Sequence, residues 1–440
     1  AGQDHDHATD IALDPDGHPV ICGWTDSADF PVMGGLTLPT NFRDAFVMRL
    51  DAGDGDILYS TRLGGDYTDM ATGLAVAPDG DLVVTGWTES SDFPTQDALQ
   101  DELNGAAYQF ADAFVTRLDA GGQTLIYSTY LGGSHDDMPA GIALGPGGEM
   151  IIAGRTQSTD YPLRHPVQAA HAGGDLDLFV TSISPGGGFL EFSTYLGGED
   201  IDRATAIAVD PAGNVHVTGP TRSVGFPTTA DAFQETFVGE IDGCEIPFGG
   251  DFNCDDAFVV KLAPDGTLAS GTSLGRSDLD QMNDLAVDAA GRACVVGYSV
   301  SADFPPDGLT GTAAIVVRRF TADGGDLDLD FTVLSGVANA GHGIGVGQDG
   351  DVYATGAIGD PAEMYVVRLT EDMATGTPRP SGRGVALLPA HPNPFNPTTE
   401  LSFRLPAAAS VQLRVYDARG REVAVLVEGP RAAGRHEVRW

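Results

Sequence analysis

Short runs of alternating apolar and polar residues, separated by turn sequences, fill most of the chain. Leu125-Ile126-Tyr127-Ser128-Thr129-Tyr130 is one such run, and its period of two predicts a β-strand. The sequence Asp14-Pro15-Asp16-Gly17 separates two other runs. Proline presets φ for a tight turn and glycine accepts positive φ, so this pattern predicts a hairpin.

The same order of four runs recurs six times along the chain. A glycine ends the second run of each repeat, at Gly23, Gly86, Gly154, Gly219, Gly297 and Gly356. Small four-stranded sheets bury both faces when they stack around an axis. The sequence therefore predicts an all-β fold, a β-propeller with six four-stranded blades visible and a seventh not excluded. A solenoid is the alternative.

Several recurring phrases carry a family resemblance. Tyr127-Ser128-Thr129-Tyr130-Leu131-Gly132-Gly133, Asp92-Phe93-Pro94 and Asp256-Ala257-Phe258-Val259 each have counterparts in other repeats. Together they resemble the bacterial SBBP β-propeller repeat over roughly residues 1–370. The resemblance implies seven blades, whereas six are visible and the sixth has only three clear strands.

The end of the chain has a different pattern. We expect the propeller at 1–376, a linker at 377–390 and a small, incomplete Ig-like β-sandwich at 391–440. Asn393-Pro394-Phe395-Asn396-Pro397 and Val415-Tyr416-Asp417 resemble the C-terminal sorting domain of type IX secretion, related to the flagellar hook-capping module. The resemblance implies export and an extracellular place at the bacterial cell surface.

The net charge of −40 is unevenly distributed: residues 1–376 carry −44 and residues 377–440 carry +4. Nucleic acid and anionic membrane both need positive charge on a partner, so we expect neither as a ligand. No apolar run of about 18 residues occurs, and we expect no transmembrane segment.

One acidic residue precedes the first predicted strand in five of the six repeats. In one interpretation these acids ring the channel mouth and bind Ca²⁺. In the other, each caps its own turn through nearby N–H groups. The residues are Asp6, Asp69, Asp137, Asp202 and Asp280.

A loop inserted in the fourth repeat has the oxygen spacing of a calcium loop at Asp251, Asn253 and Asp255. Cys244 and Cys254 lie in the same loop and could close it as a disulfide. A polar loop pinned by that disulfide is the alternative to calcium binding. Cys22 and Cys294 fall in apolar strand patterns, where we expect buried thiols.

We find no catalytic motif in the sequence and expect that the chain is not an enzyme. We expect a structural or adhesive surface protein that joins head to tail, through strand addition, with a second copy or a cell-surface component. The alternatives are a propeller hydrolase or lyase and a carbohydrate-binding propeller. The aromatic residues of the Asp-Phe-Pro loops would serve carbohydrate binding if exposed, but we expect them to pack between blades. They are Phe30, Phe93, Tyr161, Phe226 and Phe304.

Overall fold

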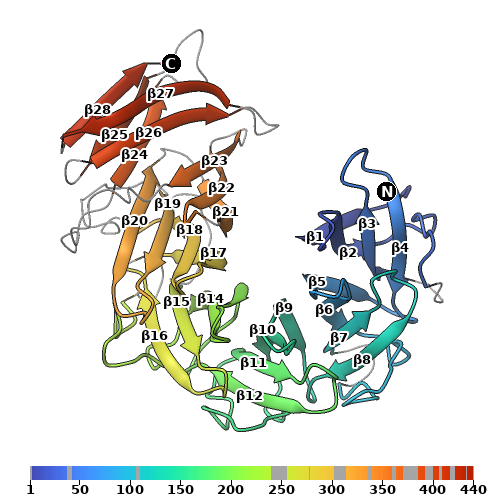
Figure 1. Ribbon diagram of the computed structural model, residues 1–440. Helices are drawn as coiled ribbons and strands as arrows, with labels where there is room; N and C mark the ends of the chain where they lie inside the picture. The colour runs from blue at the N-terminus through green and yellow to red at the C-terminus, as the bar shows by residue number, and fades with distance from the viewer. Residues whose placement is uncertain are drawn as a thin grey trace. The chain divides into compact units, whose positions relative to one another are not determined.

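The computed structural model is all-β, and its described residues contain no helix (Figure 1). It describes residues 2–36, 42–105, 110–238, 255–276, 278–301, 314–334, 339–347, 349–358, 363–369, 385–391, 400–405, 409–416, 422–432 and 434–439. The chain divides into two compact units: residues 1–217 with 262–268, and residues 218–261 with 269–440.

The repeats form blade-like antiparallel sheets, so the predicted β-propeller fold is confirmed. Each of the first four sheets has four strands in chain order. The first three lie in the first unit. The strands are β1 (Asp6–Leu13), β2 (Pro19–Thr25), β3 (Asp44–Leu50) and β4 (Ile57–Leu63); β5 (Asp69–Val76), β6 (Leu82–Thr88), β7 (Asp112–Leu118) and β8 (Leu125–Leu131); β9 (Asp137–Leu144), β10 (Met150–Thr156), β11 (Asp177–Ile183) and β12 (Leu190–Leu196); β13 (Ala206–Val209), β14 (Val215–Thr221), β15 (Asp256–Leu262) and β16 (Leu268–Leu274).

The second unit also contains the later sheets. A seven-stranded sheet has the order β17-β18-β19-β20-β24-β25-β28, a three-stranded sheet holds β21 to β23, and β26 pairs with β27. β24 begins within the predicted linker and pairs in parallel with β20. The strands are β17 (Asp280–Val287), β18 (Ala293–Ser299), β19 (Ala314–Phe320), β20 (Leu327–Leu334), β21 (Asn339–Val346), β22 (Val352–Ile358), β23 (Glu363–Leu369), β24 (Val385–His391), β25 (Glu400–Leu405), β26 (Ala409–Tyr416), β27 (Glu422–Arg431) and β28 (Gly434–Arg439).

The predicted hairpin turns are present. Gly17, Gly80 and Gly213 adopt φ of 84°, 90° and 86°, in the region where a side chain is disfavoured. Asp210 shows how the turn is closed, since its Oδ1 accepts hydrogen bonds from the N–H groups of Ala212 and Asn214, both at 2.9 Å. The turn chemistry read from the sequence therefore sets the first hairpin of the blade.

The glycine that ends the second strand makes room for an aromatic ring. A Cβ on Gly86 would lie 1.9 Å from the carbonyl oxygen of Met70 and 2.7 Å from the ring of Phe114. Phe93 in turn stacks on Phe114 with ring centroids 4.5 Å apart. The repeated glycine is thus required by close packing at the centre of the sheet.

Neighbouring blades are joined by a one-residue bulge in the first strand. Thr9 and Thr72 are the bulged residues of β1 and β5. Their hydroxyl groups donate to the carbonyl oxygens of Ala71 and Pro139 in the next blade, both at 2.9 Å. In the second unit the bulged residue of β17, Asn283, makes the same kind of bond.

Candidate functional site

The acids before the first strands are mostly buried and bind their own turns. Asp69 and Asp137 are fully buried. Oδ2 of Asp137 accepts a hydrogen bond from the N–H of Gly133 at 2.7 Å and another from the Ser158 hydroxyl at 2.8 Å. Oδ2 of Asp69 likewise accepts hydrogen bonds from the Gly65 N–H and the Ser90 hydroxyl. These are contacts that a turn-capping residue makes, and cation binding here stays a prediction.

The other three acids that precede a first strand also accept a hydrogen bond from the backbone N–H four residues earlier. Asp6 accepts bonds from the Gly2 N–H and the Thr25 hydroxyl. Asp202 accepts from the Gly198 N–H at 2.7 Å, and Asp280 accepts from the Arg276 N–H at 2.7 Å. Within the described residues, no group of three or more His, Cys, Asp and Glu side chains is arranged to hold a metal ion.

A second set of buried acids accompanies the first, and our sequence reasoning missed it. Each begins the third strand of a blade, and each is fully buried: Asp44, Asp112, Asp177 and Asp256. The backbone joins the two sets, because the N–H of Asp137 donates to the carbonyl of Ala111, just before Asp112, at 2.7 Å. The signal in the sequence is a spacing of 24 or 25 positions between the two acids.

The carboxylates of Asp112 and Asp137 face each other across Gly132. A Cβ on Gly132 would lie 2.7 Å from Oδ1 of Asp112 and 2.8 Å from Oδ2 of Asp137. Oδ2 of Asp112 accepts hydrogen bonds from the Asn104 N–H at 2.9 Å and the Gln100 amide at 2.8 Å. The Oδ1 atoms of Asp112 and Asp137 are both buried, and the Thr156 hydroxyl also stabilises the Asp137 carboxylate.

Burial changes the acidity of these groups. It raises the pKa of Asp112 to about 6 and the pKa of Asp137 to about 7, because a carboxylate loses its hydration when it leaves water. The donors on their Oδ2 atoms oppose this shift only in part. Burial likewise raises the pKa of Asp280 to about 7 in the second unit.

In the first blade an arginine supplies positive charge to the corresponding pair. Arg62 and Asp44 form a buried ion pair through Nη2 and Oδ2. Nη1 of Arg62 also donates to the carbonyl of Ser27 at 3.3 Å. Tyr130 makes the corresponding bond in the second blade, to the carbonyl of Ser90 at 2.7 Å. Tyr130 therefore makes the same hydrogen bond to the loop carbonyl as Arg62 does, but it adds no positive charge.

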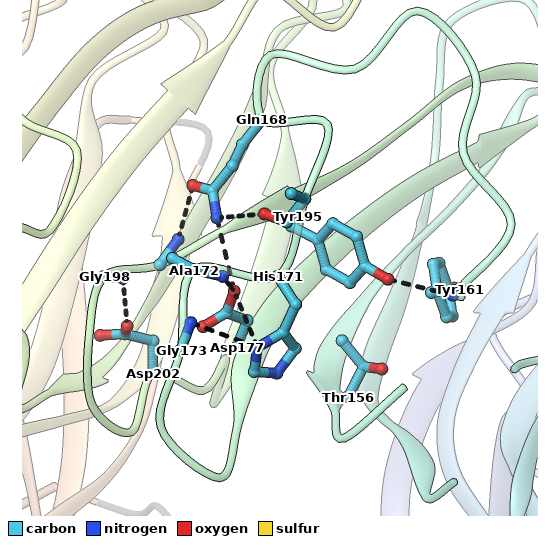
Figure 2. A network of polar contacts seen from close by, with 12 residues as sticks. Thr156, Tyr161, Gln168, His171, Ala172, Gly173, Asp177, Tyr195, Gly198 and Asp202 are labelled. Carbon is cyan, nitrogen blue, oxygen red and sulfur yellow. Dashed lines mark hydrogen bonds and ion pairs between the residues drawn. The ribbon is translucent and has the colours of Figure 1, made fainter. Parts of the chain in front are cut away.

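The third blade shows how a neighbouring loop surrounds the acid of the third strand (Figure 2). Oδ2 of Asp177 accepts hydrogen bonds from the Ala172 N–H at 2.6 Å and the Gln168 amide at 3.4 Å. Nδ1 of His171 lies 3.7 Å from the same oxygen. Burial lowers the pKa of His171, which favours the neutral ring.

The loop inserted in the fourth repeat is described only at its end. Oδ1 of Asp255 and Nε of Arg222 form a partly buried ion pair at 2.5 Å, and Oδ2 of Asp255 accepts a hydrogen bond from the Gln281 amide at 3.2 Å. Asp251, Asn253, Cys244 and Cys254 lie outside the described residues, so calcium binding and the disulfide stay predictions. The predicted buried thiols are confirmed, since Cys22 and Cys294 are free and buried.

The aromatic residues of the Asp-Phe-Pro loops pack inside the blades. Phe30, Phe93, Tyr161 and Phe226 are all buried. Each stacks or tilts against the phenylalanine of the third strand, at centroid distances of 4.5 to 4.7 Å. Burial of these four rings is confirmed and leaves them no free face for a sugar, although the ring contacts lie within one blade and not between blades as expected. Phe304 lies outside the described residues.

Comparison with known proteins identifies a β-propeller repeat in one stretch of the chain. Residues 191–227 match the family model of the SBBP beta-propeller repeat. A comparison with curated proteins gives no match. No helix in the described part of the chain has the length and apolar character needed to cross a membrane.

Similar solved structures include three enzymes. One is an ulvan lyase of polysaccharide lyase family PL25, bound to -[GlcA(1-4)Rha3S]-, with 12% identity, coverage of 82% of this chain and 78% of that chain, and a TM-score of 0.43. An apocarotenoid oxygenase mutant from Synechocystis has 10% identity, 84% and 70% coverage and a TM-score of 0.38. A PQQ-bound aldose sugar dehydrogenase from Streptomyces coelicolor has 13% identity, 83% and 95% coverage and a TM-score of 0.34.

These structures contradict our expectation that the chain is not an enzyme. The expectation rested on the lack of a catalytic motif in the sequence. The similar folds carry out lyase, oxygenase and dehydrogenase reactions, so a fold of this kind gives no ground for excluding catalysis. The likeness is remote and assigns no activity to this chain.

Proposed function

We propose that this chain is an extracellular structural or adhesive propeller of the bacterial cell surface, which associates with a second copy of itself through its first strand. The observation that carries this proposal is the exposed apolar face of β1. The side chains of Ile11 and Leu13 are 62% and 66% exposed. In the second and third blades, Leu74 and Ile142 occupy the position of Ile11, and their side chains are only 5% and 8% exposed.

The repeat explains why this face needs a cover. In the first unit, β5 packs between β1 and β9, so its apolar side chains are enclosed by strands of the same kind. Burying one Ile or Leu side chain contributes about 1.5 to 3 kcal/mol. A strand from a second copy has the shape and apolar character to cover Ile11 and Leu13. The opposite net charges of residues 1–376 and 377–440 favour a head-to-tail arrangement.

Sedimentation velocity over a range of concentrations tests self-association. We expect wild-type protein to form dimers and longer species, and Leu13→Lys to shift the population to monomer. Leu58→Lys is the matched control, because Leu58 on β4 of the same blade is 42% exposed and outside the proposed contact. A wild-type protein that stays monomeric at every concentration would overturn the assembly proposal.

The cellular location needs a separate experiment. The resemblance of residues 391–440 to a type IX sorting domain supports export. We expect antibody against the propeller to label intact cells that express the full-length gene, and protease added to those cells to remove the label. Label that appears only after the cells are lysed would contradict a place on the surface.

A further inference from the structure

Two side chains of the first unit reach the surface from strands that are otherwise buried. Trp87 is the only residue of β6 that is not buried, and Arg155 is the only such residue of β10. They occupy the same position in successive blades, directly after the strand glycine. The contact proposed for β1 uses neither of them, so their exposure calls for another explanation.

Arg155 is partly buried but has no carboxylate bound to it. Within the described residues it forms no ion pair, and its one hydrogen bond runs from Nη2 to Sδ of Met138 at 3.2 Å. Burial and the neighbouring charge of Arg203 lower the pKa of Arg155, and Asp136 opposes this shift only in part. An anion beside the guanidinium would therefore stabilise its charge.

The first blade shows how this chain neutralises an arginine on the same face. Nε and Nη2 of Arg43 donate to the two carboxylate oxygens of Asp26 at 2.8 and 3.0 Å. The third blade has Gln157 at the position of Asp26, and the N–H of each bonds to the carbonyl of the residue before the first strand. A neutral amide thus replaces the acid two positions after Arg155, which leaves room for a carboxylate or sulfate from outside.

Met138 links Trp87 to Arg155 across the joint between the second and third blades. β6 packs against β9, and the bond from the Thr72 hydroxyl to the Pro139 carbonyl fixes the register of the two blades. Met138 precedes Pro139 and pairs with Arg155. It therefore lies between the strands that carry Trp87 and Arg155, and the three side chains form one small patch.

We propose that Trp87 and Arg155 bind an acidic sugar residue, either a uronic acid or a sulfated sugar. The guanidinium fork matches a carboxylate or a sulfate, and an indole ring packs on the apolar face of a sugar ring. Within the described residues no guanidinium covers Trp87 as Arg43 covers Trp24, at 3.9 Å from the ring centroid. A protein contact buries about 800 Å² per partner, which is far more than this patch offers.

Isothermal titration of the full chain with trigalacturonate and with a sulfated carrageenan oligosaccharide tests the site. We expect at least one of the two sugars to bind, and Arg155→Gln to weaken its binding about tenfold or more, because a charge-assisted hydrogen bond is lost. Trp87→Ala should also weaken binding. Arg164→Gln is the matched control, since Arg164 is an exposed arginine of the same blade and its loss changes the net charge equally.

A further variant keeps the test decisive if Arg155→Gln does not fold by circular dichroism. Gln157→Asp retains the arginine and supplies the carboxylate that the first blade has at this position, so it should also weaken binding. Wild-type protein that binds neither sugar overturns the proposal, as does equal binding by wild type and the variants at Trp87, Arg155 and Gln157. Triglutamate that binds as tightly as the sugars overturns it in favour of an acidic peptide. None of these outcomes depends on self-association through β1, so either proposal can fail alone.

Discussion

The hydroxyl group of Tyr195 donates a hydrogen bond to the backbone carbonyl of Ser158 at 2.6 Å. It also accepts one from the backbone N–H of Tyr161 at 3.0 Å (Figure 2). The last strand of the third blade is thereby fastened to the loop that follows the second strand. This phenol satisfies two backbone groups that lie away from water.

We expect Tyr195→Phe to lower the free energy of unfolding by about 1 to 3 kcal/mol, because it leaves the buried N–H of Tyr161 unpaired and removes the shorter hydrogen bond to the Ser158 carbonyl. Urea unfolding measures the change. Tyr59→Phe is the matched control, since Tyr59 is also buried but its hydroxyl has no partner among the described residues. Its removal should leave stability unchanged or slightly higher. Equal losses in the two variants would contradict this account of Tyr195.

A substitution at Gly132 tests the close approach of the two acids. A Cβ there would lie 2.6 Å from Cγ of Asp112. We expect Gly132→Ala to destabilise the protein by about 2 kcal/mol or more, because both carboxylates are held by several hydrogen bonds. At Gly186 no atom lies within 4 Å of an added Cβ, so Gly186→Ala should be neutral or stabilising by up to about 1 kcal/mol. Thermal unfolding of the two variants gives the comparison.

The turn acid Asp210 predicts a pH dependence. Burial alone would raise its pKa, but the bonds from Asn214 and His216 outweigh burial and lower the pKa of Asp210 to about 2. A lowered folded pKa stabilises the fold above about pH 4, and that contribution is lost as the pH falls to about 2.

We therefore expect wild-type protein to be more stable than Asp210→Asn by about 1 to 2 kcal/mol at pH 7, with the difference shrinking between pH 4 and pH 2. Urea unfolding across this range measures it. Asp265→Asn changes an exposed acid of another turn, at Asp265-Gly266, and should show a smaller dependence. A difference that stays constant with pH would show that the charge of Asp210 is not its source.

The two buried thiols should be inert in the folded protein. Burial raises the pKa of Cys22 to about 12 and that of Cys294 to about 12, so little thiolate exists at neutral pH. We expect alkylation of these two residues to require unfolding. Mass spectrometry of protein treated with iodoacetamide, with and without urea, identifies the sites. Rapid modification of Cys22 in native protein would contradict its burial.

Local patterns in the sequence predicted the blades well. The turn at Asp14–Gly17, the glycine at Gly86 and the alternation in Leu125–Tyr130 each act within one sheet, so their meaning can be read from neighbouring positions. Asp137 was recognised as a candidate because it precedes a strand in a repeated phrase.

Its partner was not recognised, because Asp112 meets Asp137 only after two blades have packed together. At the first position of β7, an aspartate reads from sequence as an ordinary strand boundary. The charge on Arg62 was likewise hidden, since it occupies the position at which the second and third repeats have tyrosine. The pairing of β24 with β20 depends on contacts across more than 50 residues, which periodicity does not report.

The bulged residues of the first strands have an evolutionary consequence. Thr9 and Thr72 each reach a main-chain carbonyl of the following blade, and a carbonyl is present whatever the side chain. One copied repeat therefore brings both its sheet and the connector to its neighbour. A tandem duplication of a repeat that carries this threonine would therefore copy the connection along with the sheet.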